Sequence, residues 1–140
     1  MNTFQSQTTL KGHKFDIRAL EFSKDGKYLY SAGHGGMLVW DLRNLGDPVE
    51  KIEERQDIFC LKSTQNMLYL GCRNHSIIPV GLSYQKLFAD QVHPPLKPLH
   101  MDVVTSLTTL MDDQIMISAS KDKNLKAWHT EDSSKLLPTL

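Results

Sequence analysis

Serine, histidine and aspartate occur in the C-terminal third of the chain in a combination that could perform nucleophilic hydrolysis. The candidates are His100, Ser118 or Ser120, and Asp122. In a serine hydrolase the histidine takes the proton of the serine hydroxyl and the carboxylate orients the histidine. The reaction also needs hydrogen-bond donors for the oxyanion, and the sequence indicates none. Hydrolysis is therefore a remote alternative, and we expect no enzyme activity.

Metal and phosphate binding are the other chemistries that these side chains raise. The chain has six histidines and two cysteines. His13 and His34 belong to different predicted loops, and Cys60 and Cys72 lack a CxxC partner, so no pair has the spacing of zinc ligands. The stretch GHGG (33–36) lacks the lysine and following helix of a phosphate-binding loop. We expect no metal, no cofactor, buried thiols and a hairpin turn at 33–36.

Composition and charge are typical of an ordinary soluble globular domain. The 140 residues are 40% hydrophobic and 23% charged, which is enough apolar material for one core. The formal net charge is zero, so no overall field attracts a phosphate backbone or an anionic membrane. The first residues do not read as a signal peptide. We therefore expect a cytoplasmic protein, with the nucleus left open, and neither nucleic acid nor membrane as a partner.

The elements that position these side chains recur three times along the chain. Residues 12–42 align with residues 99–130, and residues 54–82 repeat the same rhythm less regularly. The two clear copies match at four pairs of positions, with one residue of slack in a hairpin turn: His13 with His100, Ile17 with Val104, Leu20 with Leu107, and Trp40 with Trp128.

Each copy is predicted to consist of short strands rather than helices. In the first copy the strands span residues 16–22, 27–32 and 37–42. The turn between the first two contains Asp25-Gly26, a strong hairpin signal. A weaker fourth strand is expected after each copy, over residues 49–52, 85–89 and 134–137. The pattern therefore predicts an all-β fold with four antiparallel strands per unit.

This pattern resembles the WD-repeat β-propeller family, whose repeats run from a Gly-His pair to a Trp-Asp pair over four strands. The first copy has both pairs, Gly12-His13 and Trp40-Asp41. In the third copy Leu99 replaces the glycine and His129 replaces the aspartate.

The middle copy departs most from the family pattern. It has Glu54 in place of the histidine, Asn74 in place of the turn acid and Val80 in place of the tryptophan. Pro79 also lies inside its third predicted strand and removes a ladder hydrogen bond.

The resemblance implies about three four-stranded blades that form part of a larger ring, because closed propellers have four to eight blades. Further blades of a parent chain, or self-association, would complete it. The assignment is residues 1–12 as the outer strand of a preceding or closing blade, 13–53 as blade 1, 54–99 as blade 2 and 100–140 as blade 3.

The resemblance also implies that four side chains pin each blade: a loop histidine, a strand serine or threonine, a turn aspartate and a strand tryptophan. In the third copy these are His100, Ser118 or Ser120, Asp122 and Trp128, and the first copy keeps His13 and Trp40. A buried indole, hydroxyl and imidazole each need a partner, which one hydrogen-bonded chain supplies. Both serines lie on one strand face, so the sequence does not choose between them.

His34 occupies an unusual position in this pattern. Counting back six residues from Trp128 reaches Asp122, and counting back six from Trp40 reaches His34. His34 is therefore expected at the position of the acid, facing His13, with a solvent-facing side chain as the alternative. An aspartate at position 34 is expected to stabilise this blade.

The function implied by the resemblance is a non-catalytic scaffold that binds proteins or peptides through its loop face. An alternative is a regulatory or cargo-binding module of a larger machine, because residues 97–128 faintly resemble the tail propellers of kinesin-type motors. The candidate partner-binding residues are Lys14, Phe15, Asp16, His34, Arg73, His75, Met101, Asp102, Lys121 and Lys123. Aromatic, methionine and arginine side chains amid mixed charge suit an interaction surface.

Overall fold

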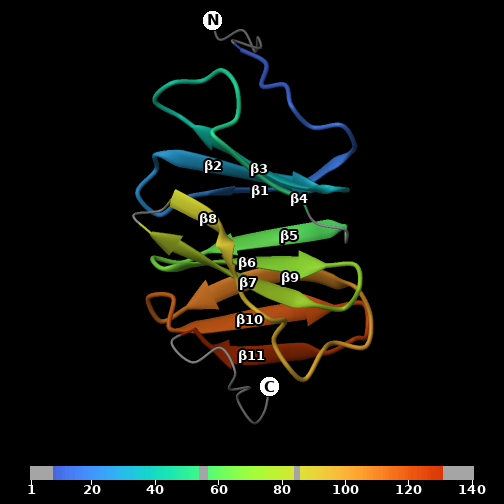
Figure 1. Ribbon diagram of the computed structural model, residues 1–140. Coiled ribbons are helices and arrows are strands. Elements are labelled where there is room, and N and C mark those ends of the chain that lie inside the picture. Colours follow the sequence, from blue (N-terminus) through green and yellow to red (C-terminus); the bar gives the residue numbers. More distant parts are fainter. Residues whose placement is uncertain (1–7, 54–56, 84–85, 131–140) are drawn as a thin grey trace, which may run out of the picture.

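The computed structural model describes residues 8–53, 57–83 and 86–130, and its regular elements there are all β-strands. They form three antiparallel sheets that follow one another in chain order (Figure 1). The first sheet has the order β1 (Ile17–Phe22), β2 (Tyr28–Gly33), β3 (Gly36–Asp41) and β4 (Glu50–Glu53). The second has the order β5 (Ile58–Ser63), β6 (Met67–Cys72), β7 (Ile77–Ser83) and β8 (Lys86–Val92). The third contains β9 (Val104–Leu110), β10 (Ile115–Ser120) and β11 (Leu125–His129).

The all-β fold and the antiparallel order predicted from the sequence are confirmed. The fourth strand expected at 134–137 lies outside the described residues, as does Glu54. The outer strand expected over residues 1–12 stays a prediction, because residues 1–7 are also outside and residues 8–12 carry no strand. Within the described part of the chain, no helix is long and apolar enough to cross a membrane.

The turns between the second and third strands differ in length among the sheets. In the first sheet only His34 and Gly35 separate β2 from β3. Gly35 and the following Gly36 have φ angles of +90° and +130°, a region that favours glycine. In the third sheet residues 121–124 separate β10 from β11. The turn between β2 and β3 is therefore shorter than the turn between β10 and β11, and its side chains are less able to fold back over the sheet.

Two apolar layers hold the three sheets together. Between the first and second sheets, Tyr30 and Met37 pack in one buried cluster with Leu68 and Val80. A second buried cluster joins the second and third sheets. Its members are Tyr69, Ile77, Leu96, Val104, Leu107, Met116 and Trp128. Successive side chains of β6 enter opposite clusters, as the pleat requires, so the middle sheet is buried on both faces.

The first strands of the three sheets, β1, β5 and β9, are spatial neighbours in sequence order. The Ser63 backbone amide donates to the Glu21 carboxylate at 2.8 Å, and the Ser63 hydroxyl donates to the Phe22 carbonyl at 2.8 Å. A Cβ atom on Gly71 would lie 2.2 Å from the Sγ atom of Cys60 on the paired strand β5, and 2.9 Å from the Cγ1 atom of Val104 in the third sheet. The close approach of these strands therefore requires glycine at position 71.

A further ion pair joins the first sheet directly to the third. The Lys24 Nζ atom lies 3.0 Å from the Asp113 carboxylate. Lys24 belongs to the turn between β1 and β2, and Asp113 to the turn between β9 and β10.

Candidate functional site

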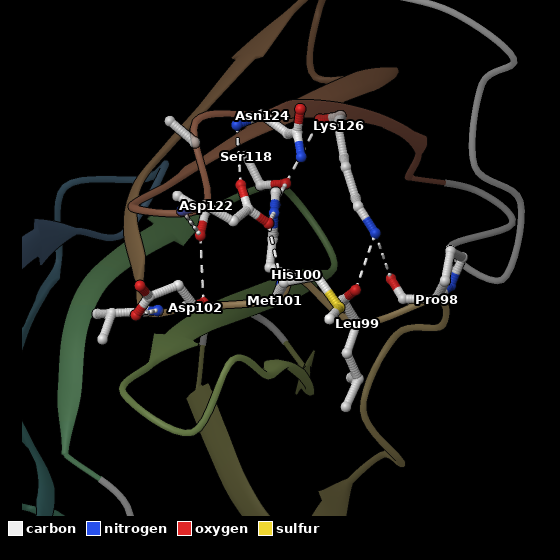
Figure 2. A network of polar contacts seen from close by, with 12 residues as sticks. Pro98, Leu99, His100, Met101, Asp102, Ser118, Asp122, Asn124 and Lys126 are labelled. Atoms are coloured by element: carbon white, nitrogen blue, oxygen red, sulfur yellow. Dashed lines mark hydrogen bonds and ion pairs between the residues drawn. The ribbon is translucent and has the colours of Figure 1, made fainter.

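A hydrogen-bonded chain of four side chains lies inside the third sheet. Figure 2 shows its members His100, Ser118 and Asp122. The Nδ1 atom of His100 lies 2.8 Å from the Asp122 carboxylate, and its Nε2 atom lies 2.8 Å from the Ser118 hydroxyl. The Trp128 indole donates to the same hydroxyl at 3.0 Å. We call His100, Ser118, Asp122 and Trp128 the third-sheet tetrad. It ties the loop before β9 to the turn after β10.

Ser118 and Ser120, which the sequence could not separate, have different partners. Ser118 belongs to the tetrad. Ser120 donates to the Asp102 carbonyl at 3.1 Å and accepts from the Asp122 amide at 3.1 Å. Ser118 has no exposed surface, so no substrate reaches its hydroxyl in this conformation.

The Asp122 carboxylate is the acceptor on which this arrangement converges. It accepts the Met101 amide at 2.9 Å and the Asn124 amide at 2.8 Å in addition to His100. Burial raises the pKa of Asp122, but the hydrogen bonds from Met101, His100 and Asn124 outweigh it and bring the pKa to about 2. The carboxylate is therefore ionised at neutral pH and holds both the histidine and the loop backbone.

The first sheet contains the same arrangement without its acid. The His13 Nε2 atom lies 2.6 Å from the Ser31 hydroxyl, and the Trp40 indole donates to this hydroxyl at 2.8 Å. Ser31 follows His13 by 18 residues, as Ser118 follows His100. Four residues after the serine, where the third sheet has Asp122, the first sheet has Gly35.

His34 does not take the place of the missing acid beside His13. Its Nδ1 atom instead contacts the Asp57 carboxylate, just before β5 of the second sheet. Its ring also forms a T-shaped contact with the ring of Phe15, with the ring centroids 4.9 Å apart. The short turn explains the difference. Counting back six residues from Trp40 reaches His34, whereas counting forward four residues from Ser31 reaches Gly35.

Asp57 is a residue that the sequence reasoning missed. It lies 3.5 Å from the Arg73 guanidinium as well as against His34. Burial raises the pKa of Asp57, but the hydrogen bonds from His34 and Arg73 and the charge of Arg18 bring it below its usual value. Asp57 sits in the degenerate copy, where the family pattern assigns it no role, so only its position just before a predicted strand could have drawn attention.

The vacant acid position of the first sheet opens into a cleft of about 210 Å³. The cleft lies between the loop before β1, the turn between β2 and β3, and strand β4. Burial holds the pKa of His13 below its usual value. The lining residues are Gly12, His13, Lys14, Phe15, His34, Gly35, Gly36, Met37, Leu38, Lys51 and Ile52.

The candidate partner-binding residues lie at one end of the sheets. In each antiparallel sheet, the loop before the first strand and the turn after the second strand share an end. The contact of His34 with Asp57 joins these ends in the first two sheets, and the approach of Gly71 to Val104 joins them in the second and third. All of the candidates are exposed except Asp102, which is half-buried. We call this end the loop face.

The two cysteines are free thiols. Neither Cys60 nor Cys72 forms a disulfide, and burial raises the pKa of Cys60 to about 12. Among the described residues, no three histidine, cysteine, aspartate or glutamate side chains gather as metal ligands would.

Comparison with known proteins gives one family match. The model of the family "WD domain, G-beta repeat" matches residues 4–41 and 96–129, which together make up just over half of the chain. The middle copy falls between the two matched segments, in agreement with its irregular sequence.

Curated relatives come from Saccharomyces cerevisiae. U3 small nucleolar RNA-associated protein 12 is 24% identical over 130 residues, which is 92% of this chain and 13% of that protein. Protein DOA1 is 31% identical over 129 residues, which is 89% of this chain and 17% of that protein. Ribosomal RNA-processing protein 9 is 24% identical over 138 residues and is covered to 22%. The chain thus spans less than a quarter of each of these relatives.

Solved structures share the fold. The WD40 repeats of RRP9 superpose with a TM-score of 0.77 at 21% identity, covering 91% of this chain and 40% of that one. The computationally designed Ika4 protein superposes with a TM-score of 0.75 at 20% identity, covering 99% of this chain and 80% of that one.

Proposed function

Because the chain belongs to the WD-repeat family, we propose that it is a non-catalytic scaffold that binds protein or peptide partners through its loop face. The observation that carries this proposal is the position of exposed apolar side chains next to histidines that are hydrogen-bonded to a buried serine hydroxyl. Met101 is 80% exposed and directly follows His100, which is 1% exposed. Phe15 is 59% exposed and lies two residues after His13. The hydrogen bonds of His13, of His100 and of the Met101 amide hold the loop backbone that carries these side chains, and a preformed loop lowers the entropic cost of binding.

The composition of the loop face supports the same proposal. Phe15, Met101 and Arg73 are exposed there among lysines and aspartates. Aromatic, methionine and arginine side chains are the types enriched at interface centres, and mixed charge suits an interface rim.

A larger ring is also part of the proposal. Leu20 and Phe22 of β1 are 64% and 60% exposed. They pair with Ser31 and Leu29, on the face of the first sheet that Trp40 also occupies and that points away from the second sheet. We propose that a further blade, from a parent chain or from a second copy, covers this face.

The names of two relatives bear on location and partners. One relative is named for association with a small nucleolar RNA and another for ribosomal RNA processing. We propose on this basis that the chain belongs to a ribonucleoprotein assembly in the nucleus rather than acting in the cytoplasm. With a net charge of zero, it would contact the proteins of such an assembly rather than its RNA. These relatives give no support to the alternative of a module of a kinesin-type motor.

Quantitative affinity capture from nuclear extract tests the proposal. The full chain is compared with Phe15→Ser and Met101→Ser, and Met111→Ser is the matched control. Met111 is 62% exposed but lies in the turn between β9 and β10, at the opposite end of the sheets. We expect the same set of proteins to be lost by both loop-face variants, kept by the control and kept after ribonuclease treatment. Loss through Met111→Ser alone would place the binding surface at the other end.

A further inference from the structure

The first and third sheets differ at one group in an otherwise shared framework. In both, a strand tryptophan and a loop histidine hydrogen-bond to one serine hydroxyl. In the third sheet the other ring nitrogen of the histidine is held by the Asp122 carboxylate. In the first sheet the corresponding residue is Gly35, which has no side chain, and a cleft lies at that position.

The positions of the hydrogen atoms in this framework determine which hydrogen-bond donors face the cleft. We assign the tautomer of His13 by correspondence with His100, whose Nδ1 atom donates to the Asp122 carboxylate and whose Nε2 atom accepts from the serine hydroxyl. In the same arrangement the Ser31 hydroxyl accepts the indole hydrogen of Trp40 and donates its own hydrogen to the Nε2 atom of His13. A neutral imidazole that accepts at Nε2 carries its hydrogen on Nδ1. Among the described residues, no acceptor contacts this Nδ1 atom. His13 therefore presents a hydrogen-bond donor toward the vacant position.

A backbone donor accompanies it. In the third sheet the amide of Met101, the residue after the histidine, donates to the Asp122 carboxylate. The corresponding amide in the first sheet is that of Lys14, and it has no hydrogen-bond acceptor within the described part of the chain. The His13 ring and the Lys14 amide thus correspond to the His100 ring and the Met101 amide, which are two of the donors that hold the Asp122 carboxylate in the third sheet.

Among the residues that the structure describes, the charged side chains lining the cleft are the two lysines Lys14 and Lys51. A volume of about 210 Å³ also exceeds the roughly 30 Å³ that one water molecule occupies in the liquid, so a side-chain carboxyl group fits.

We propose that this cleft binds the side-chain carboxylate of an aspartate or glutamate from a protein partner, which occupies in the first sheet the position that Asp122 occupies in the third. The partner thereby completes the hydrogen-bonded chain of His13, Ser31 and Trp40. This inference rests on the proposed binding function of the loop face and adds the chemistry of one contact. A planar carboxylate is favoured over a phosphate because the same framework already holds one at Asp122.

Histidine ring signals in nuclear magnetic resonance spectra of the ¹⁵N-labelled full chain test the proposal. The probe is a Gly-Asp-Gly peptide with an acetylated N-terminus and an amidated C-terminus, so that its carboxylate is the side chain. We expect a saturable shift of the His13 Nδ1 signal at millimolar peptide. His100, whose Nδ1 atom is already held by Asp122, is the internal control and should not shift. The matching Gly-Asn-Gly peptide should leave both histidines unchanged.

Four results would overturn the proposal: no response of His13, an equal response to the asparagine peptide, a response confined to a peptide whose carboxylate is its free C-terminus, or tighter binding of inorganic phosphate. The last would point to a nucleic-acid backbone. The capture experiment above does not depend on His13, so an unresponsive His13 with a functional loop face rejects the carboxylate site alone.

Two variants sharpen the assignment. Asp122→Ala vacates the acid position of the third sheet, and His100 should then begin to respond to the aspartate peptide. His13→Phe removes the ring donor and should weaken peptide binding roughly tenfold or more, the usual effect of losing a hydrogen bond to a charged group. If either variant fails to fold, the response of His13 in the unaltered chain still decides the proposal.

Discussion

The imidazole of His34 contacts the carboxylate of Asp57, 23 residues further along the chain and next to the first strand of another sheet. Arg73, from the second turn of that sheet, approaches the same carboxylate. Asp57 therefore joins the loop-face turns of the first two sheets. The His34 side chain, which the sequence pattern placed beside His13 of its own sheet, links two sheets.

The His34→Asp variant should be less stable than the natural chain by about 0.5 to 1.5 kcal/mol, the range of one hydrogen bond. The substitution places a second carboxylate beside Asp57 and removes a hydrogen bond. Urea unfolding of the full chain measures the change. In an Asp57→Asn background the loss should shrink, because the two sites are coupled. A raised midpoint for His34→Asp would restore the alternative in which position 34 serves His13.

The Asp122→Ala variant should lose about 1 to 3 kcal/mol of unfolding free energy, because His100 and two backbone amides lose their acceptor. Asn74→Ala in the second sheet is the comparison and should cost well under about 1 kcal/mol. The Asn74 side chain is exposed and accepts one amide, that of Ser76, at 3.2 Å. Equal losses at the two positions would contradict the importance of the third-sheet tetrad.

Ser118→Ala and Ser120→Ala should separate two serines that share a strand face. Ser118 is fully buried and partners both His100 and Trp128, so its loss should cost about 1 to 3 kcal/mol. Ser120 is half-buried and bonds only backbone groups, so its loss should cost less than about 1 kcal/mol. Thermal unfolding of both variants gives the order, and a larger loss at Ser120 would reverse the assignment.

Stability should fall in acid through Asp122. Its pKa is about 2 in the folded chain and about 4 in an unfolded one. A group whose pKa is lowered on folding stabilises the fold fully above the unfolded value, and the contribution is lost as the pH falls from about 4 to about 2. Asp122→Asn should flatten the pH dependence of the unfolding free energy in this window. Asp57, whose pKa is also lowered, should add a smaller effect of the same sign.

The second sheet should not tolerate the serine that the other two sheets require. Leu70 is the fourth residue of β6, as Ser31 and Ser118 are of β2 and β10. Leu70→Ala should cost about 2 to 5 kcal/mol through the cavity it leaves. Leu70→Ser should cost about 1 kcal/mol more, because the buried hydroxyl finds neither histidine nor tryptophan. Equal stability of the two variants in urea would indicate a hydrogen-bond partner for the new hydroxyl.

The fold could be predicted from the sequence because its signals are local. Asp25-Gly26 specifies a turn, and alternating apolar residues specify the strands on either side of it. The spacing from His100 to Trp128 then fixes the distance between the loop and the third strand of one sheet. Each of these relations lies within one repeat, where the sequence separation is short.

The site was only partly predictable, because some of its contacts join different repeats. The choice of Ser118 over Ser120 depends on how the Asp122 turn folds back over β10. The pairing of His34 with Asp57 depends on the packing of one sheet against the next. The serine and the tryptophan are 9 residues apart in the first sheet and 10 apart in the third. This difference decides whether position 34 or 35 corresponds to the acid, and counting from a single end of the repeat does not reveal it.

The ion pair between Lys24 and Asp113 constrains the shape of the whole stack. Packed sheets lie about 10 Å apart, so flat parallel sheets would put the first and third about 20 Å from each other. A lysine side chain does not bridge such a gap, yet the two charged groups are 3.0 Å apart. The turns that carry Lys24 and Asp113 must therefore lie close together, so the first and third sheets are inclined to each other rather than stacked flat. Further sheets added with the same inclination would follow a curve about one axis, and they would not form a straight stack.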